Sequence, residues 1–187
     1  YLFYIPFVCR AQVSEIQWLK NLGGSGSEYF EQIIFTSDSN YLAVGFTTSD
    51  DFDIVVNNGE FDYFAVKFDT IGNIIWKKNY GGSLSDICYS VVETPEGNYM
   101  LAGESFSNDG DVTATQLLKN VWLLLVNSDG EILCQKTYGG SINETAKSIS
   151  INEHGNYVIC GETNSNDGDG SGNHLFGTYD FWVAEID

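Results

Sequence analysis

The chain has 187 residues, of which 43% are hydrophobic and 14% aromatic, a composition typical of a folded globular protein rather than a disordered one. Its 26 Asp and Glu residues outnumber 8 Lys and Arg residues, which gives a net charge of −18. Negative charge repels phosphate groups and anionic lipids, so the composition argues against nucleic acid as a partner and against adhesion to a membrane surface. Cationic and neutral partners are favoured.

The N-terminal residues 1–11, YLFYIPFVCRA, form an apolar run that ends in small side chains. Cys9 and Ala11 stand at the −3 and −1 positions of a possible cleavage after Ala11, as in a secretory signal peptide. We interpret residues 1–11 as the remnant of such a signal and expect a secreted or cell-surface protein; a buried N-terminal strand is the alternative. No other stretch approaches the roughly 18 apolar residues of a membrane-spanning helix, so membrane insertion is not expected.

An internal repeat with a period of 58 residues runs through the rest of the chain, and it divides residues 12–187 into three repeats at about 18–75, 76–133 and 134–187. Repetition of this length is typical of solenoids and propellers. Three features mark each repeat. A Gly-Gly pair begins at Gly23, Gly81 and Gly139, and an Asn-Tyr pair begins at Asn40, Asn98 and Asn156. A single glycine follows at Gly45, Gly103 and Gly161.

Short apolar runs with a period of two predict β-strands that have one buried face. In chain order the first repeat reads IQWLK, QIIFT, NYLAVGFT and YFAVKFD, and the second repeat opens on IIWKKNY. Gly, Asn and Asp turns separate these runs, and helical periodicity extends no further than ATQLLKN. We therefore predict an all-β chain with four strands per repeat and with the Gly-Gly pairs at turns or strand ends.

Four-stranded repeats of about 40 to 60 residues indicate the blades of a β-propeller. The chain opens on IQWLK, a fourth-strand element, and ends on FWVAEID, a third-strand element. A closed propeller needs at least about four blades, so we expect this chain to be part of a larger propeller that is truncated at the C-terminus. Aromatic residues at repeated positions are expected to be buried between blades, and these are Trp18, Trp76, Trp122 and Trp182.

The four cysteines form no Cys-x-x-Cys pair and have no His at metal-binding spacing. Cys88, Cys134 and Cys160 align with apolar residues of the other repeats. We therefore expect these three to be buried hydrophobic side chains rather than disulfide partners.

The repeated letters SNDGD, at 107–111 and 165–169, are compatible with a turn or with a calcium loop. In the third repeat Asp167, Asp169 and Ser171 stand at positions one, three and five of a calcium loop, and glycine follows at position six. Thr178 occupies the twelfth position, where a Glu would complete such a loop. We predict weak calcium binding by this loop, with an ordinary Asn-Asp-Gly turn as the alternative.

The other two repeats match the calcium pattern less well. The second repeat offers Asp109, Asp111 and Thr113 but has Ala114 in place of the glycine, and the first repeat keeps only Asp51 and Asp53. No other cofactor is expected.

The strings WKKNYGGSLSD, GNYMLAGESFSNDGD and DFWVAEID resemble a family of secreted β-propeller repeats that is abundant in Bacteroidetes. The resemblance covers residues 15–187, and it implies a propeller fold in a protein that often ends in a sorting domain for type IX secretion. The first repeat departs from the family pattern with TSDDFDIVVNNG, and Cys134 replaces the repeated tryptophan. A weaker resemblance links Asp69, Gly72 and Trp76 to the quinoprotein propellers, although these residues are one position closer together than that motif requires.

Motifs for catalysis are missing from the sequence, which contains no G-x-S-x-G and no phosphate-binding loop. His154 is expected in an exposed turn, and His174 is a candidate to join the Asp167 loop. Carboxylates that recur in every repeat favour a scaffold over a single active site. We therefore predict no enzyme activity and no catalytic residues.

The predicted function is that of a noncatalytic, secreted or cell-surface propeller segment for interaction, adhesion or carbohydrate binding. The expected partner is an extracellular polymer or protein. The alternative is part of a propeller enzyme, a hydrolase or a quinoprotein, whose active site lies in further blades.

Overall fold

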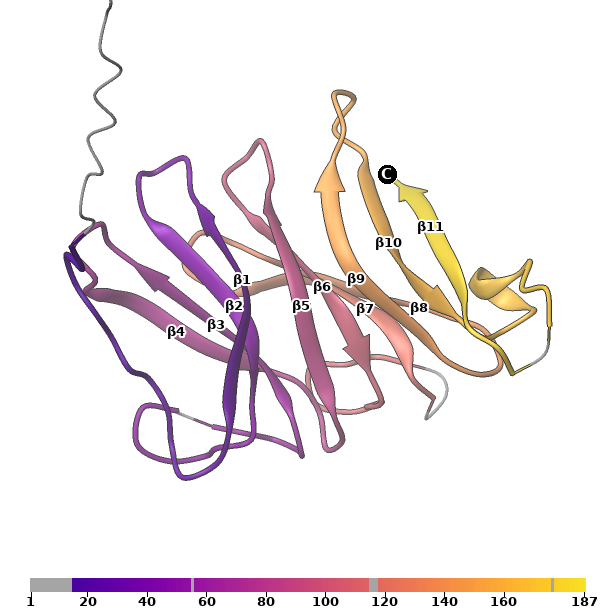
Figure 1. Ribbon diagram of the computed structural model, residues 1–187, viewed down its shortest axis with the longest axis horizontal. Coiled ribbons are helices and arrows are strands. Elements are labelled where there is room, and N and C mark those ends of the chain that lie inside the picture. Colours follow the sequence, from indigo (N-terminus) through magenta and orange to yellow (C-terminus); the bar gives the residue numbers. More distant parts are fainter. Residues whose placement is uncertain (1–14, 55, 115–117, 176) are drawn as a thin grey trace, which may run out of the picture.

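Three antiparallel sheets follow one another along the chain in the computed structural model, which describes residues 15–54, 56–114, 118–175 and 177–187. They lie in a row, with the first sheet at the left of Figure 1 and the third at the right. Residues 1–11 fall outside the described residues, so the signal peptide stays a prediction. Within the described ranges, no helix is long and apolar enough to cross a membrane.

Each sheet is a meander in which strands that are consecutive in the sequence pair side by side. The first sheet contains β1 (Glu28–Phe35), β2 (Tyr41–Thr47), β3 (Asp62–Phe68) and β4 (Ile74–Tyr80). The second sheet contains β5 (Asp86–Glu93), β6 (Tyr99–Ser105), β7 (Asn120–Val126) and β8 (Ile132–Tyr138). The third sheet contains β9 (Glu144–Ile151), β10 (Tyr157–Thr163) and β11 (Asp180–Ile186).

These bounds confirm the all-β prediction, because the helix that the structure describes is a single 3₁₀ turn, η1 (Gly168–Gly170). The Gly-Gly pairs lie at strand ends, as expected: two of them directly follow β4 and β8, and the first precedes β1. Residues 16–20 do not form the strand that IQWLK predicted. A strand needs a neighbour for its backbone hydrogen bonds, and the described residues place no third strand before this segment.

A β-bulge recurs in the first strand of every sheet and explains the repeated single glycine. The register with the second strand shifts between Phe30 and Gln32, and the other two sheets shift at the equivalent positions. The glycine opposite the bulge is Gly45, Gly103 or Gly161. A Cβ atom at any of these glycines would overlap the backbone carbonyl of the facing strand, so a larger residue does not fit.

The sheets pack face to face, and their first strands β1, β5 and β9 lie next to one another. We call the face of a sheet that contacts the following sheet its outgoing face, and the opposite one its incoming face. At the first junction, Tyr63 on the outgoing face packs against Trp122 with ring centroids 4.5 Å apart, and the Tyr63 hydroxyl donates to the Trp122 carbonyl at 2.9 Å. At the second junction, Val121 and Leu123 pack in one cluster with Ile149 and Trp182.

One polar contact recurs at both junctions. Gln32 Oε1 accepts the Val91 backbone N–H at 2.7 Å, and Ser90 Oγ, at the position equivalent to Gln32, accepts the Ile149 N–H at 3.2 Å. Ser90 Oγ also donates to Gln32 Oε1 at 2.7 Å. A buried N–H without a partner is costly, so this contact fixes the register between neighbouring first strands.

The tryptophan prediction holds for two of the four residues. Trp122 and Trp182 are buried at the junctions, and Trp76 is half-buried. Trp18 is 37% exposed, and its burial was wrongly predicted because it lies at the open end of the row. Trp18 still repeats the contact of Trp76: its indole N–H donates to the Thr70 carbonyl at 3.2 Å, as that of Trp76 donates to the equivalent Ser128 carbonyl at 2.9 Å.

The three cysteines in the described residues are free, and they differ in burial. Cys88 is buried in the first junction, as predicted. Cys134 and Cys160 are exposed, which corrects the prediction. Cys134 lies on the outer strand β8, and Cys160 lies on the outgoing face of the third sheet, which no described residue covers.

Ser90→Ala is expected to destabilise the protein by about 1 to 3 kcal/mol, because the substitution leaves the buried Ile149 N–H without its acceptor. Ser148, the repeat equivalent of Ser90, is exposed and provides the matched control. Ser148→Ala should change stability by less than about 0.5 kcal/mol. Urea unfolding of both variants measures the difference, and equal effects would contradict the role of the inter-sheet contact.

Candidate functional site

Four consecutive backbone N–H groups that begin at the Gly-Gly pair are bound by side chains of the sheet that follows, three of them by the loop that contains SNDGD and one by the first strand. In the second sheet Asp111 accepts the Gly81 N–H at 3.2 Å, and Asp109 accepts the Ser83 N–H at 2.7 Å. Ser107 Oγ accepts the N–H of Leu84 at 3.0 Å. The fourth group, Gly82 N–H, donates to Asp86 on the first strand at 2.7 Å. We call this arrangement the clasp.

The clasp is present in all three sheets with the same donors and acceptors. In the third sheet the four N–H groups of Gly139, Gly140, Ser141 and Ile142 donate to Asp169, Glu144, Asp167 and Ser165. In the first sheet those of Gly23, Gly24, Ser25 and Gly26 donate to Asp53, Glu28, Asp51 and Ser49. The repeated pattern is therefore Ser-x-Asp-x-Asp, which the first repeat retains although it lacks the letters SNDGD.

The residue between the two clasp carboxylates has a positive φ in every sheet. Gly110 and Gly168 have φ angles of 62° and 57°, and Phe52 has 52° at the equivalent position. A left-handed conformation favours glycine, so the glycine of SNDGD is explained by the backbone rather than by a ligand. Phe52 adopts the left-handed conformation although it is not a glycine, and its side chain is exposed.

The candidate calcium residues lie in these clasps. One oxygen of Asp167 accepts from Ser141, one oxygen of Asp169 accepts from Gly139, and Ser171 is exposed just after η1. Asp109 and Asp111 have the same roles in the second sheet, and Thr113 is exposed. The clasp accounts for the spacing of the carboxylates. Calcium binding by the third loop stays a prediction, and in the described part of the chain no group of three or more His, Cys, Asp and Glu side chains is placed to hold a metal ion.

Two buried carboxylates meet behind the second clasp, at the first junction. Asp62 begins β3 and Asp86 begins β5, and both are fully buried. Asp62 Oδ2 accepts the Asn58 N–H at 2.7 Å, whereas Asp62 Oδ1 and Asp86 Oδ1 have no hydrogen-bond partner. Burial, together with the nearby charge of Asp86, raises the pKa of Asp62 to about 7, and burial also raises the pKa of Asp86.

The second junction replaces this acidic pair by an amide and a carboxylate. Asn120 and Glu144 occupy the positions of Asp62 and Asp86, and both lie against Gly139 as the acidic pair lies against Gly81. A Cβ atom at either glycine would come within 3 Å of these side-chain oxygens, so a larger residue would force the side chains to move. Asp62 and Asp86 do not stand out in the sequence individually. They could have been found by aligning the repeats, because a polar residue recurs at both positions.

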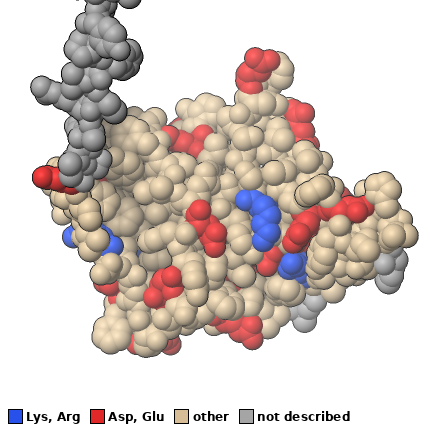
Figure 2. Space-filling view, viewed as in Figure 1, with Lys and Arg blue, Asp and Glu red and all other residues tan. Residues whose placement is uncertain are grey.

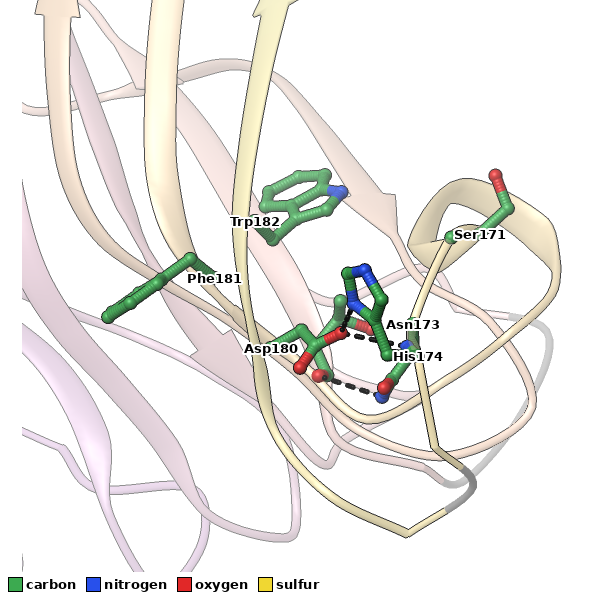
Figure 3. A pocket seen from close by; sticks show the side chains of 8 residues that line it. Ser171, Asn173, His174, Asp180, Phe181 and Trp182 are labelled. Carbon is green, nitrogen blue, oxygen red and sulfur yellow. Dashed lines mark hydrogen bonds and ion pairs between the residues drawn. The ribbon is translucent and has the colours of Figure 1, made fainter.

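A cavity of about 270 Å³ lies beside the third clasp, where the loop between β10 and β11 is two residues longer than its counterpart. Figure 3 shows the His174 ring against Asp180, with Trp182 above it. Asp180 Oδ2 accepts the His174 backbone N–H at 2.8 Å and lies 2.6 Å from His174 Nδ1. Asn173 closes the loop by donating to the Thr178 carbonyl at 2.7 Å. The hydrogen bonds from His174 lower the pKa of Asp180.

This arrangement corrects the hypothesis for His174, which binds Asp180 rather than the Asp167 loop. Asp180 is the repeat equivalent of Asp62 and Asn120, so the longer loop gives this position a new partner. The Ser171 side chain points away from His174 (Figure 3), and the three residues therefore do not form a Ser-His-Asp relay. His154 lies in an exposed turn between β9 and β10, as predicted.

No protein-family model matches this chain, and no curated protein matches it significantly.

The native protein should lose stability as the pH rises from about 4 to about 7, and Asp62→Asn should abolish the part of this loss that is due to Asp62. A carboxyl whose pKa rises from about 3.9 in the unfolded chain to about 7 on folding stabilises the protein below pH 4, and this contribution is lost as the pH rises through 7. The decline attributable to Asp62 is at most about 4 kcal/mol. Urea unfolding at several pH values measures it in the native chain and in Asp62→Asn, which copies Asn120. Equal pH dependence in both proteins would contradict the raised pKa.

Calcium titration of the purified chain is expected to release heat with a Kd of about 0.1 to 1 mM, because the third loop has clustered carboxylates but no acid at position twelve. Asp167→Asn keeps an oxygen for the Ser141 N–H and removes the charge, so binding should be lost while the clasp remains. Asp109→Asn makes the same change in the second clasp and is the control. Absence of heat at millimolar calcium, or the same heat from Asp167→Asn, would leave the loop with its clasp role alone.

Proposed function

We propose that this chain is a run of β-propeller-type blades that binds extracellular carbohydrate without catalysing a reaction. The proposal includes export from the cell, for which residues 1–11 have the composition of a signal remnant. The single observation that carries the binding role is the cavity beside the third clasp, because it is the place where the third repeat departs from the other two.

Three features support the blade architecture. Each sheet is an antiparallel meander, the first strands β1, β5 and β9 are neighbours, and the sheets pack face to face through equivalent residues. The clasp ties the second-to-third-strand loop to the segment that precedes the first strand, so both connections lie at one edge of the row. Propeller blades arrange their strands and loops in this way around a central axis.

The chemistry of the cavity favours a sugar. The Asp180 carboxylate lines the cavity and can accept from hydroxyl groups, and the exposed His174 ring has a second nitrogen besides the one that lies against Asp180. The cavity has room for about one sugar ring. Acidic side chains are spread over the face in Figure 2 and Lys side chains are few, so a neutral or cationic sugar is favoured over an anionic one.

Binding of defined oligosaccharides tests this proposal. Isothermal titration with neutral cello-oligosaccharide, cationic chitosan oligosaccharide and anionic oligogalacturonate should show binding of a neutral or cationic probe and none of the anionic probe. His174→Ala removes the imidazole from the cavity and should weaken binding at least about tenfold, a loss of about 1.4 kcal/mol. His154→Ala removes the other His, which lies in the exposed turn at the opposite end of β10, and should leave binding unchanged.

Two results would refute the proposal. The first is that no probe binds at millimolar concentration. The second is that His174→Ala and His154→Ala bind equally well, which would place the sugar outside this cavity.

A further inference from the structure

The incoming face of the first sheet exposes residues whose repeat equivalents are buried. Ile33 on β1 is 57% exposed, whereas Val91 and Ile149, at the same position in β5 and β9, are 1% and 6% exposed. Phe30 is 48% exposed, whereas its equivalents Cys88 and Ala146 are fully buried. The second and third sheets are each covered by a preceding sheet, whereas no sheet within the described residues covers this face of the first one.

The outgoing face of the third sheet shows the complementary pattern. Phe181 is fully exposed, whereas its equivalents Tyr63 and Val121 are fully buried. Val183 is 68% exposed, whereas its equivalents Ala65 and Leu123 are 0% and 3% exposed. The row therefore ends in one open outgoing face and one open incoming face, and these two kinds of face form both junctions inside the chain.

One open face has a hollow where the other has a large side chain. A hollow of about 370 Å³ lies on the outgoing face of the third sheet, bordered by Cys160, Phe181 and Val183. At the two internal junctions, the incoming face has the small residues Cys88 and Ala146 at the position equivalent to Phe30. The open incoming face of the first sheet has the large Phe30 there. A large side chain therefore faces a hollow, which satisfies the packing requirement of a buried interface.

The polar contact of the junctions is also available. Ser148 occupies the position of Gln32 and Ser90 and is exposed on the third sheet. The Ile33 N–H occupies the position of the Val91 and Ile149 N–H groups, which Gln32 and Ser90 accept. If a second copy packs as the next sheet does at an internal junction, its Ile33 N–H lies at Ser148 Oγ of the first copy.

We propose that two copies of this chain associate head to tail, with the outgoing face of the third sheet of one copy against the incoming face of the first sheet of the other. The interface is a third instance of the junction that the chain builds twice internally. It rests on the exposure of equivalent residues in the described part of the chain, and a further blade on either face would take the place of the second copy.

Electrostatic repulsion opposes this association, because each copy carries a net charge of −18. Salt screens charge over about 8 Å at physiological ionic strength and over about 3 Å at 1 M. The association should therefore strengthen as salt is added, whereas contact through exposed ion pairs would weaken.

Light scattering coupled to size exclusion, at micromolar to millimolar protein and at two salt concentrations, tests the proposal. The native chain should show a concentration-dependent species of at least twice its mass of 20.7 kDa, favoured by high salt. Ile33→Asp damages the incoming face, and Val183→Asp damages the outgoing face. Each variant should associate at least about tenfold more weakly than the native chain, because the substitution places a charge in the buried junction.

Mixing the two variants distinguishes head-to-tail contact from contact between identical faces. Ile33→Asp retains an intact outgoing face, Val183→Asp retains an intact incoming face, and the mixture should form a heterodimer. Ile71→Asp changes an exposed apolar residue in the β3–β4 turn and should associate like the native chain. A native chain that stays monomeric at both salt concentrations, variants that associate normally, or a mixture without heterodimer would each overturn the proposal.

Discussion

Neighbouring sheets in this protein are held by a face-to-face junction, in which buried apolar side chains accompany a hydrogen bond from a backbone N–H of one first strand to a side chain of the preceding one. Gln32 and Ser90 provide the acceptor for the following sheet, and the N–H groups of Val91 and Ile149 provide the donors. The register set by this bond decides which side chains meet across the junction, because it fixes how far one first strand is shifted along the next.

The clasp provides hydrogen-bond acceptors for the backbone N–H groups of a connection that has no regular secondary structure. Four consecutive N–H groups precede the first strand of each sheet, and side chains accept all four; in the second sheet these are the N–H groups of residues 81–84. Charged acceptors shorten and strengthen such bonds. The arrangement gives the chain many carboxylates in places where they hold backbone rather than a substrate, which accounts for part of its acidity.

Much of the fold could be predicted from the sequence, because period-two apolar runs and Gly-Gly pairs are local signals. The 58-residue period also made equivalent residues comparable. The calcium pattern illustrates the limit: spacing in SNDGD is compatible with a loop around an ion and with a clasp, and only the positions of Gly81 and Ser83 reveal the partners of Asp111 and Asp109. The burial of Trp18 and Cys160 was mispredicted for a different reason, since repeat equivalence predicts burial only where a neighbouring sheet is present. The pairing of His174 with Asp180 depends on how a longer loop folds, which the sequence pattern does not specify.

Amide hydrogen exchange, followed residue by residue by NMR on a dilute sample of the monomeric chain, tests the repeated junction most directly. The N–H groups of Val91 and Ile149 are bonded across a junction, whereas the equivalent N–H of Ile33 lies on the open face. The account predicts slow exchange at Val91 and Ile149 and fast exchange at Ile33. Fast exchange at all three residues would show that the sheets do not share the junction described here.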